Sequence, residues 1–184
     1  MAIDLDGTND YVNPGNVFTP GTGDFTLSVW FNVDAVTGFM VIVGDETGPG
    51  LIRLAVRGDQ AGDPVWWSLS NSDGTGLVEL AATTAIVVGT WYHAAGIRTG
   101  ATMRIYINGV QEGTSSVGPT GSLSNAAAST IGAQDSGIGG FTDGRVEDVR
   151  YFTRVLSVEE IAILAAGYRG PLGGEAGWWS CDNF

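Results

Sequence analysis

The segment that most restricts the fold of this chain is residues 91–110, WYHAAGIRTGATMRIYINGV. From Trp91 to Ile97, alternate residues fall on one face of an extended chain, a period typical of β-strands. A second run, residues 103–107, is rich in β-branched and aromatic residues. Asn108-Gly109 follows, the dipeptide that best tolerates the positive φ angles of a type I′ hairpin turn. The segment therefore predicts a β-meander.

Similar patterns recur along the chain. The clearest amphipathic strand is residues 24–33, and further short strand patterns follow at the spacing of about 8–12 residues that β-sandwiches show. They cover residues 2–5, 39–43, 51–57, 65–70, 77–82, 128–133 and 144–152. One helix is expected over residues 157–166, because Ser157 and Glu160 form a capping box and Gly167 suits the position after the helix.

Four sets of motifs resemble a known family. They are residues 91–98 (WYHAAGIR) with 104–109 (RIYING), residues 4–12 (DLDGTNDYV), residues 25–31 (FTLSVWF), and residues 143–151 with 154–161. Taken in their order along the chain, they resemble the signatures of laminin G-like domains of the concanavalin A-like lectin and glucanase superfamily. The resemblance implies an all-β, two-sheet antiparallel jelly-roll β-sandwich, with its first and last strands side by side. It covers roughly residues 2–168, so we expect a domain at 1–168 and a connector with an aromatic tail at 169–184.

Charge and hydropathy argue against several classes of partner. The net charge is −12 and all eight basic residues are arginines, so the chain is expected to repel phosphate backbones and not to bind nucleic acid. No stretch approaches the roughly 18 apolar residues of a membrane span, which predicts no membrane insertion. The N-terminal residues lack the pattern of a signal peptide, which predicts synthesis in the cytoplasm.

No catalytic pattern is found. Some members of the superfamily hydrolyse glycans with two spaced carboxylates, as acid–base cleavage requires. Here Glu147 and Asp148 are adjacent and are expected to point to opposite faces of a strand. His93, the single histidine, has no accompanying nucleophile pattern, so we expect a packing role and no enzymatic activity.

Two binding sites are candidates. Asp6, Asp10 and Asp143 could gather beside each other and hold calcium, which takes 6–8 oxygen ligands; alternatively, Asp6-Gly7 and Asp143-Gly144 are simply turns. Trp66 and Trp67 are neighbours in a strand, so one must face away from the other. An outward tryptophan could stack on a sugar ring or dock a partner, or it could lie under a loop.

The tail carries Trp178, Trp179 and Phe184, and burying each of these large side chains is worth about 1.5–3 kcal/mol. They are expected to pack on protein, either as an edge strand of the same sandwich or, preferably, on a neighbouring subunit. Two functions remain open. The first is a structural or interaction module on a particle surface, such as a virion decoration or fibre protein with other subunits as partners. The second is a calcium-assisted lectin that binds surface glycans.

Overall fold

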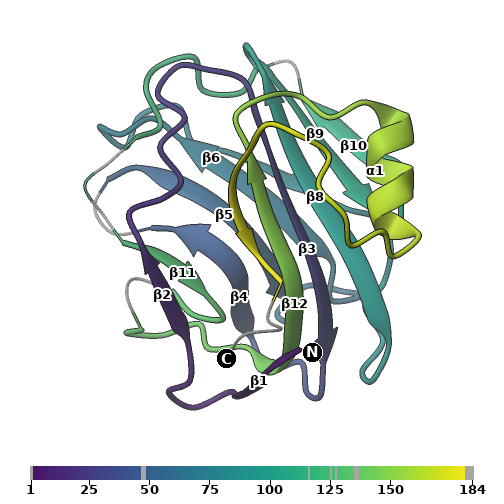
Figure 1. Cartoon of the computed structure of the whole chain (residues 1–184). Helices are drawn as coiled ribbons and strands as arrows, with labels where there is room; N and C mark the ends of the chain where they lie inside the picture. The colour runs from purple at the N-terminus through teal and green to yellow at the C-terminus, as the bar shows by residue number, and fades with distance from the viewer. Residues whose placement is uncertain are drawn as a thin grey trace.

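The chain forms a sandwich of two antiparallel sheets in the computed structural model, which describes residues 2–46, 49–115, 117–124, 126, 128–134 and 137–180 (Figure 1). Sheet A contains, from one edge, β1 (Ile3–Asp6), β12 (Asp143–Phe152), β3 (Phe25–Val33), β8 (Trp91–Thr99), β9 (Thr102–Ile107) and β10 (Val110–Ser115), with β13 (Glu175–Trp179) also paired to β12. Sheet B contains β2 (Val12–Gly15), β11 (Ser129–Ile131), β4 (Phe39–Asp45), β5 (Leu51–Arg57), β6 (Val65–Ser70) and β7 (Val78–Ala81).

The predicted fold class is confirmed. β8, β9 and β10 form the expected meander, and Asn108 and Gly109 both have positive φ angles, 49° and 83°, as the turn requires. The first and last strands of the family motif lie side by side, since β1 pairs with β12 from Ile3–Val146 to Asp6–Asp143. Strand β2 was not expected, because its proline and glycine obscure any strand pattern.

The core lies between the sheets and is built from alternate residues of each strand. At its centre, the Trp67 ring crosses β8 at Gly96, where a Cβ atom would lie 2.4 Å from the ring. The Trp67 indole Nε1 donates to the Ile97 carbonyl at 3.3 Å, and the whole side chain is buried. The expectation that Trp67 binds a ligand is therefore wrong, because it is an inward-facing core residue.

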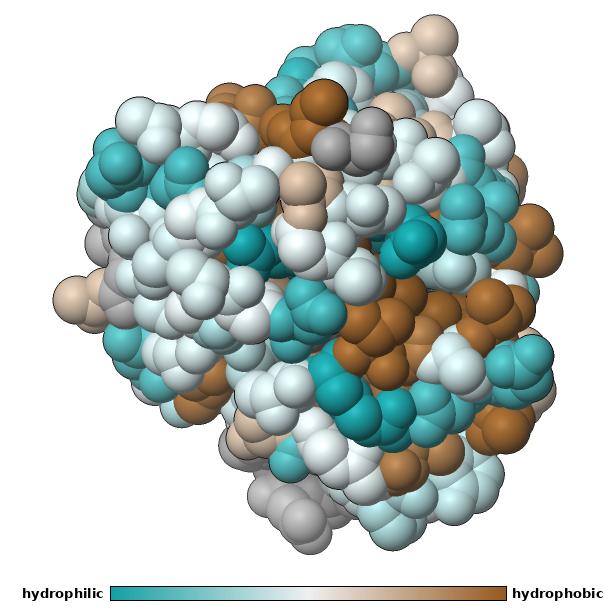
Figure 2. All heavy atoms as spheres, turned by 90° about the horizontal axis from the view of Figure 1, so that it is seen from above, coloured by the Kyte–Doolittle hydropathy of each residue, from teal (hydrophilic) through white to brown (hydrophobic). Residues whose placement is uncertain are grey.

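The predicted helix forms as α1 (Val158–Ala165), with the capping box between Ser157 and Glu160 in place. Its buried residues, Ile161 and Leu164, pack on the outer face of sheet A. Seen from above, the larger apolar area of the surface lies on the right of Figure 2, the side on which Figure 1 draws α1. In the described part of the chain, no helix combines the length and the apolarity that crossing a bilayer requires.

The tail packs on its own domain. β13 pairs with residues 149–152 of β12, next to β1, which pairs with residues 143–146. Trp179 packs against the core, and its ring lies edge-on to Phe18 with 6.0 Å between ring centroids. The preference for packing Trp178 and Trp179 on a neighbouring subunit is thus corrected: the open edge of β12 receives them. Phe184 lies outside the described residues.

Candidate functional site

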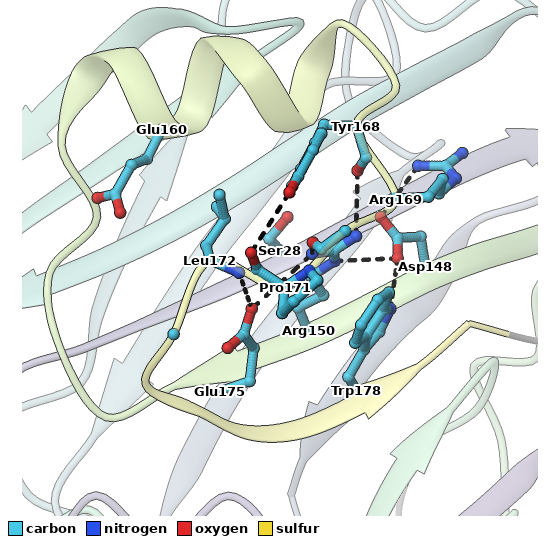
Figure 3. A network of polar contacts seen from close by, with 12 residues as sticks. Ser28, Asp148, Arg150, Glu160, Tyr168, Arg169, Pro171, Leu172, Glu175 and Trp178 are labelled. Carbon is cyan, nitrogen blue, oxygen red and sulfur yellow. Dashed lines mark hydrogen bonds and ion pairs between the residues drawn. The ribbon is translucent and has the colours of Figure 1, made fainter.

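The outer face of sheet A is covered by α1 and by the segment that leads into β13. Arg150 is fully buried beneath this segment (Figure 3). Its Nη1 donates to the Gly170 carbonyl at 2.7 Å, and its Nη2 donates to the Tyr168 carbonyl at 3.0 Å. The Trp178 ring stacks on the guanidinium group, with 4.2 Å between the ring centroid and the guanidinium carbon. This face is therefore occupied by the protein itself.

Asp148 is the anion of this buried cluster. It sits at a β-bulge with a φ angle of 52°, and its carboxylate accepts from Arg150 Nε at 2.9 Å, Arg169 Nη1 at 2.9 Å and Trp178 Nε1 at 2.7 Å. Arg169 also contacts Glu147 at 3.4 Å. The expectation that Glu147 and Asp148 point to opposite faces is wrong, because the bulge breaks the strand alternation between them.

His93 lies under the same cover. Its Nε2 is 2.8 Å from Ser28 Oγ, and both residues are buried. Burial lowers the pKa of His93 to about 3, and the positive charges of Arg169 and Arg150 act in the same direction. The imidazole is therefore neutral and shielded from substrates, which fits the expected packing role.

The outer face of sheet B carries a different arrangement: α1, the one helix of the described residues, lies against sheet A (Figure 1). Strand alternation turns Arg53, Arg57 and Trp66 outward, beside Phe39 on β4. These four form what we call the arginine–aromatic row. The guanidinium carbon of Arg53 lies 4.5 Å from the Phe39 ring centroid, and that of Arg57 lies 5.6 Å from Phe39 and 4.7 Å from Trp66. Flat apolar and charged groups thus alternate along the row.

Carboxylates hold both arginines of the row. Arg53 donates to Glu46 at 2.9 Å and to Glu79 at 3.1 Å. Arg57 binds Asp59 through two parallel hydrogen bonds of 2.8 Å. These bonds lower the pKa of Asp59 to about 2 and raise the pKa of Arg57, so the pair stays charged at every physiological pH.

Two small residues of the same outward face lie beneath the side chains of the row. They are Ala55, the register partner of Trp66, and Ser68, the register partner of Arg53, and both are fully buried. Trp66 is half-buried, and its indole Nε1 has no hydrogen-bond partner among the described residues. No enclosed pocket is found in the described part of the chain.

The family described as the concanavalin A-like lectin/glucanases superfamily, in its laminin G branch, matches residues 6–162. The chain belongs to this family. Among curated proteins, no sequence relative matches the chain.

Solved structures extend the likeness of this laminin G-like domain. A heptameric SAP-like pentraxin from Limulus polyphemus has 20% identity and a TM-score of 0.64, with 89% of this chain and 81% of that chain covered. The CBM40 module of a Ruminococcus gnavus IT-sialidase, bound to α2,3-sialyllactose, has 13% identity and a TM-score of 0.75, with 89% and 96% covered. Domain 4 of a GH43 extracellular arabinanase from Geobacillus stearothermophilus, in complex with arabinotriose, has 17% identity and a TM-score of 0.72, with 89% and 76% covered. At these identities the likeness shows the fold.

The three aspartates expected to hold calcium lie at the end of the laminin G-like sandwich. Asp6 and Asp143 are register partners, and Asp10 Oδ2 accepts from the Asp6 amide at 3.3 Å. Asp6 Oδ1 in turn accepts from the amides of Thr8 and Asn9, and these bonds lower the pKa of Asp6. Within the described residues, no group of three or more histidine, cysteine, aspartate or glutamate side chains is arranged to hold a metal. The turn interpretation accounts for these contacts, and calcium binding stays a prediction.

Sequence reasoning named Trp66 but missed its neighbours on the face. Arg53 and Arg57 are four residues apart on the same side of β5. The alternating apolar residues Ile52, Leu54 and Val56, which face inward, carried that signal in the sequence. Phe39 could not be joined to them from sequence, since its place opposite Arg57 depends on the pairing of β4 with β5.

Proposed function

We propose that this domain is a non-catalytic carbohydrate-binding module that binds glycans across the outer face of sheet B. The observation that carries the proposal is the arginine–aromatic row, in which aromatic rings alternate with guanidinium groups that are held by carboxylates. A sugar ring presents apolar C–H groups on its faces and hydroxyl groups at its rim. Aromatic rings suit the faces, and carboxylates and guanidinium groups suit the rim.

Two of the similar structures support this class of ligand, because they contain α2,3-sialyllactose and arabinotriose. A catalytic role is disfavoured by the way the acids are held. Glu46 and Glu79 both bind Arg53, and hydrolysis would need two carboxylates free to exchange protons with the glycosidic bond.

The role on a virion or another particle, with other subunits as partners, stays a prediction. None of the three relatives named above is described as a particle component, and no contact within the described residues favours that role over glycan binding.

The experiment compares the wild-type domain with Trp66→Ala on an oligosaccharide array, followed by calorimetry. Trp91→Ala, a half-buried tryptophan at the start of β8 in sheet A, is the matched control. We expect the wild type and the control to bind a common glycan, and Trp66→Ala to bind it at least about ten-fold more weakly, equivalent to about 1.4 kcal/mol. If no glycan binds, or if Trp66→Ala binds as well as the control, the proposed function is wrong.

A further inference from the structure

From the charges around the arginine–aromatic row we infer that the glycan is neutral, without carboxylate, sulfate or phosphate groups, and that Glu79 and Asp59 enforce this selectivity. The inference rests on the proposed function and names the substrate class of the same site. The similar structures contain both kinds of ligand, since sialyllactose is anionic and arabinotriose is neutral, and the inference chooses the neutral kind for this domain.

The first step is the balance of charge on the face. Two arginines, Arg53 and Arg57, meet three carboxylates, those of Glu46, Glu79 and Asp59. The face is thus net negative, and it belongs to a chain of net charge −12. An approaching anion meets repulsion, and no unpaired cation among the described residues of this face offsets it.

The second step is the occupancy of the guanidinium groups. Recognition of a sugar carboxylate favours a guanidinium with two parallel N–H groups to spare. Arg53 already donates from Nη1 to Glu46 and from Nη2 to Glu79, and its Nε is buried. Arg57 uses Nε and Nη2 on Asp59. The remaining N–H groups, on Nη1 and Nη2, point away from Asp59, and the Asp59 carboxylate already balances the charge of Arg57. A neutral hydroxyl oxygen therefore fits there better than a second anion.

The third step is the supply of acceptors. Glu79 accepts from Arg53 Nη2 and Ser68 Oγ through Oε1, which leaves Oε2 for a ligand, and its side chain is 29% exposed. The Asp59 side chain is 46% exposed. An ionised carboxylate can only accept hydrogen bonds, so it binds the hydroxyl groups at the rim of a neutral sugar and repels a carboxylate or sulfate group. The face therefore favours neutral sugars over anionic ones.

The test measures affinity by calorimetry for matched pairs: lactose with α2,3-sialyllactose, and neutral arabino- and xylo-oligosaccharides with their uronate-bearing counterparts. Each is measured in low salt, about 20 mM, where electrostatic repulsion is least screened. We expect the neutral member of a bound pair to bind at least ten-fold more tightly. The Glu79→Gln and Asp59→Asn variants should bind the anionic glycan of each pair several-fold more tightly than the wild type does. The ratio of neutral to anionic affinity should therefore fall. Glu159→Gln, which removes the same charge from an exposed position on α1, should leave that ratio unchanged.

Two failures can be told apart. If an anionic glycan binds more tightly than its neutral partner and Trp66→Ala abolishes that binding, the site is a glycan site but the inferred selectivity is wrong. If no glycan of either kind shows binding that depends on Trp66, the proposed function fails and the inference fails with it.

Discussion

The outer faces of the two sheets place the same pair of residue types in different surroundings. On sheet A, Arg150 lies 4.2 Å from the Trp178 ring and is fully buried. On sheet B, Arg57 lies 4.7 Å from the Trp66 ring and its side chain is 20% exposed. The difference is the cover: the segment before β13 supplies carbonyl groups to Arg150 (Figure 3). Within the described residues, the Arg57 guanidinium is bonded to the Asp59 carboxylate and to no backbone carbonyl.

Under the proposed function, this comparison separates residues that stabilise the fold, on sheet A, from residues that bind the ligand, on sheet B. A buried arginine must have its charge balanced and its donors bonded, because an unpaired buried charge is costly. An exposed ion pair contributes little to stability, so its groups can serve a ligand without weakening the fold. We therefore expect substitutions on sheet A to change folding and substitutions on sheet B to change binding.

The largest expected effect is that of Asp148→Asn. Asparagine keeps the shape of the side chain and tolerates the positive φ angle, but it removes the carboxylate that Arg150 Nε binds at 2.9 Å. Arg150 then keeps Glu175, 3.9 Å away, as an ion-pair partner. Removing one partner of a buried ion pair costs about 3–5 kcal/mol, and urea unfolding would measure the loss. The matched variant Asp59→Asn breaks the exposed pair on sheet B and should leave the unfolding midpoint unchanged. Equal losses in the two variants would show that the comparison is wrong.

A smaller effect should appear in the pH dependence of stability. The folded pKa of His93 is about 3, below its ordinary value of 6.5, so between these values the unfolded chain binds a proton that the folded chain excludes. Acidification therefore favours unfolding, and the free energy of unfolding should fall by about 1.4 kcal/mol for each pH unit below about 6 because of this group. The exclusion depends on burial and on the charges of Arg150 and Arg169.

His93→Gln tests this directly, because glutamine does not titrate and can still reach Ser28. Urea unfolding at several values between about pH 6.5 and pH 4 should show a shallower slope in the variant, by about one proton. An unchanged slope would mean that His93 is protonated in the folded state. On sheet B, by contrast, Asp59 stays charged down to about pH 2, so this pair gives glycan affinity no pH dependence over the same range.

Much of the fold could be predicted because its rules are local. The alternation of β3, the Asn108-Gly109 turn and the capping box of Ser157 with Glu160 each depend on neighbours in sequence. Even the inward direction of Trp67 was readable, since Val65, Trp67 and Leu69 are apolar at every second position while Ser68 and Ser70 share the face of Trp66.

The rest depends on contacts between distant segments. Asp148 carries no local signal for its bulge, which is held by Arg169 and Trp178 from beyond the helix. The tail strand is too short to show a pattern. It forms because β1 pairs only with residues 143–146 of β12, which leaves the same edge of residues 149–152 open for β13. The arginine–aromatic row likewise needs the pairing of β4, β5 and β6 before its members meet.

The smallest expected effect is that of calcium at the first turn, and it extends the comparison to a third region. On sheet A, carboxylates bonded by the protein serve the fold, and Asp6 is also bonded in this way, by the amides of Thr8 and Asn9. A calcium ion would have to share these oxygens, which argues for a weak site with a Kd of about 10⁻³ M, in the range of extracellular modules.

At a calcium concentration equal to that Kd, the gain is about 0.4 kcal/mol, which raises the melting temperature of a domain of this size by only about 1 °C. Differential scanning calorimetry in calcium and in chelator would measure it, with Asp6→Asn as the variant that should abolish the shift. If calcium raised the melting temperature by many degrees and Asp6→Asn removed that rise, a carboxylate already bonded within the protein could still bind a ligand tightly. The separation of fold-stabilising from ligand-binding carboxylates would then be wrong. No shift at any calcium concentration would leave Asp6, Asp10 and Asp143 as residues of a turn.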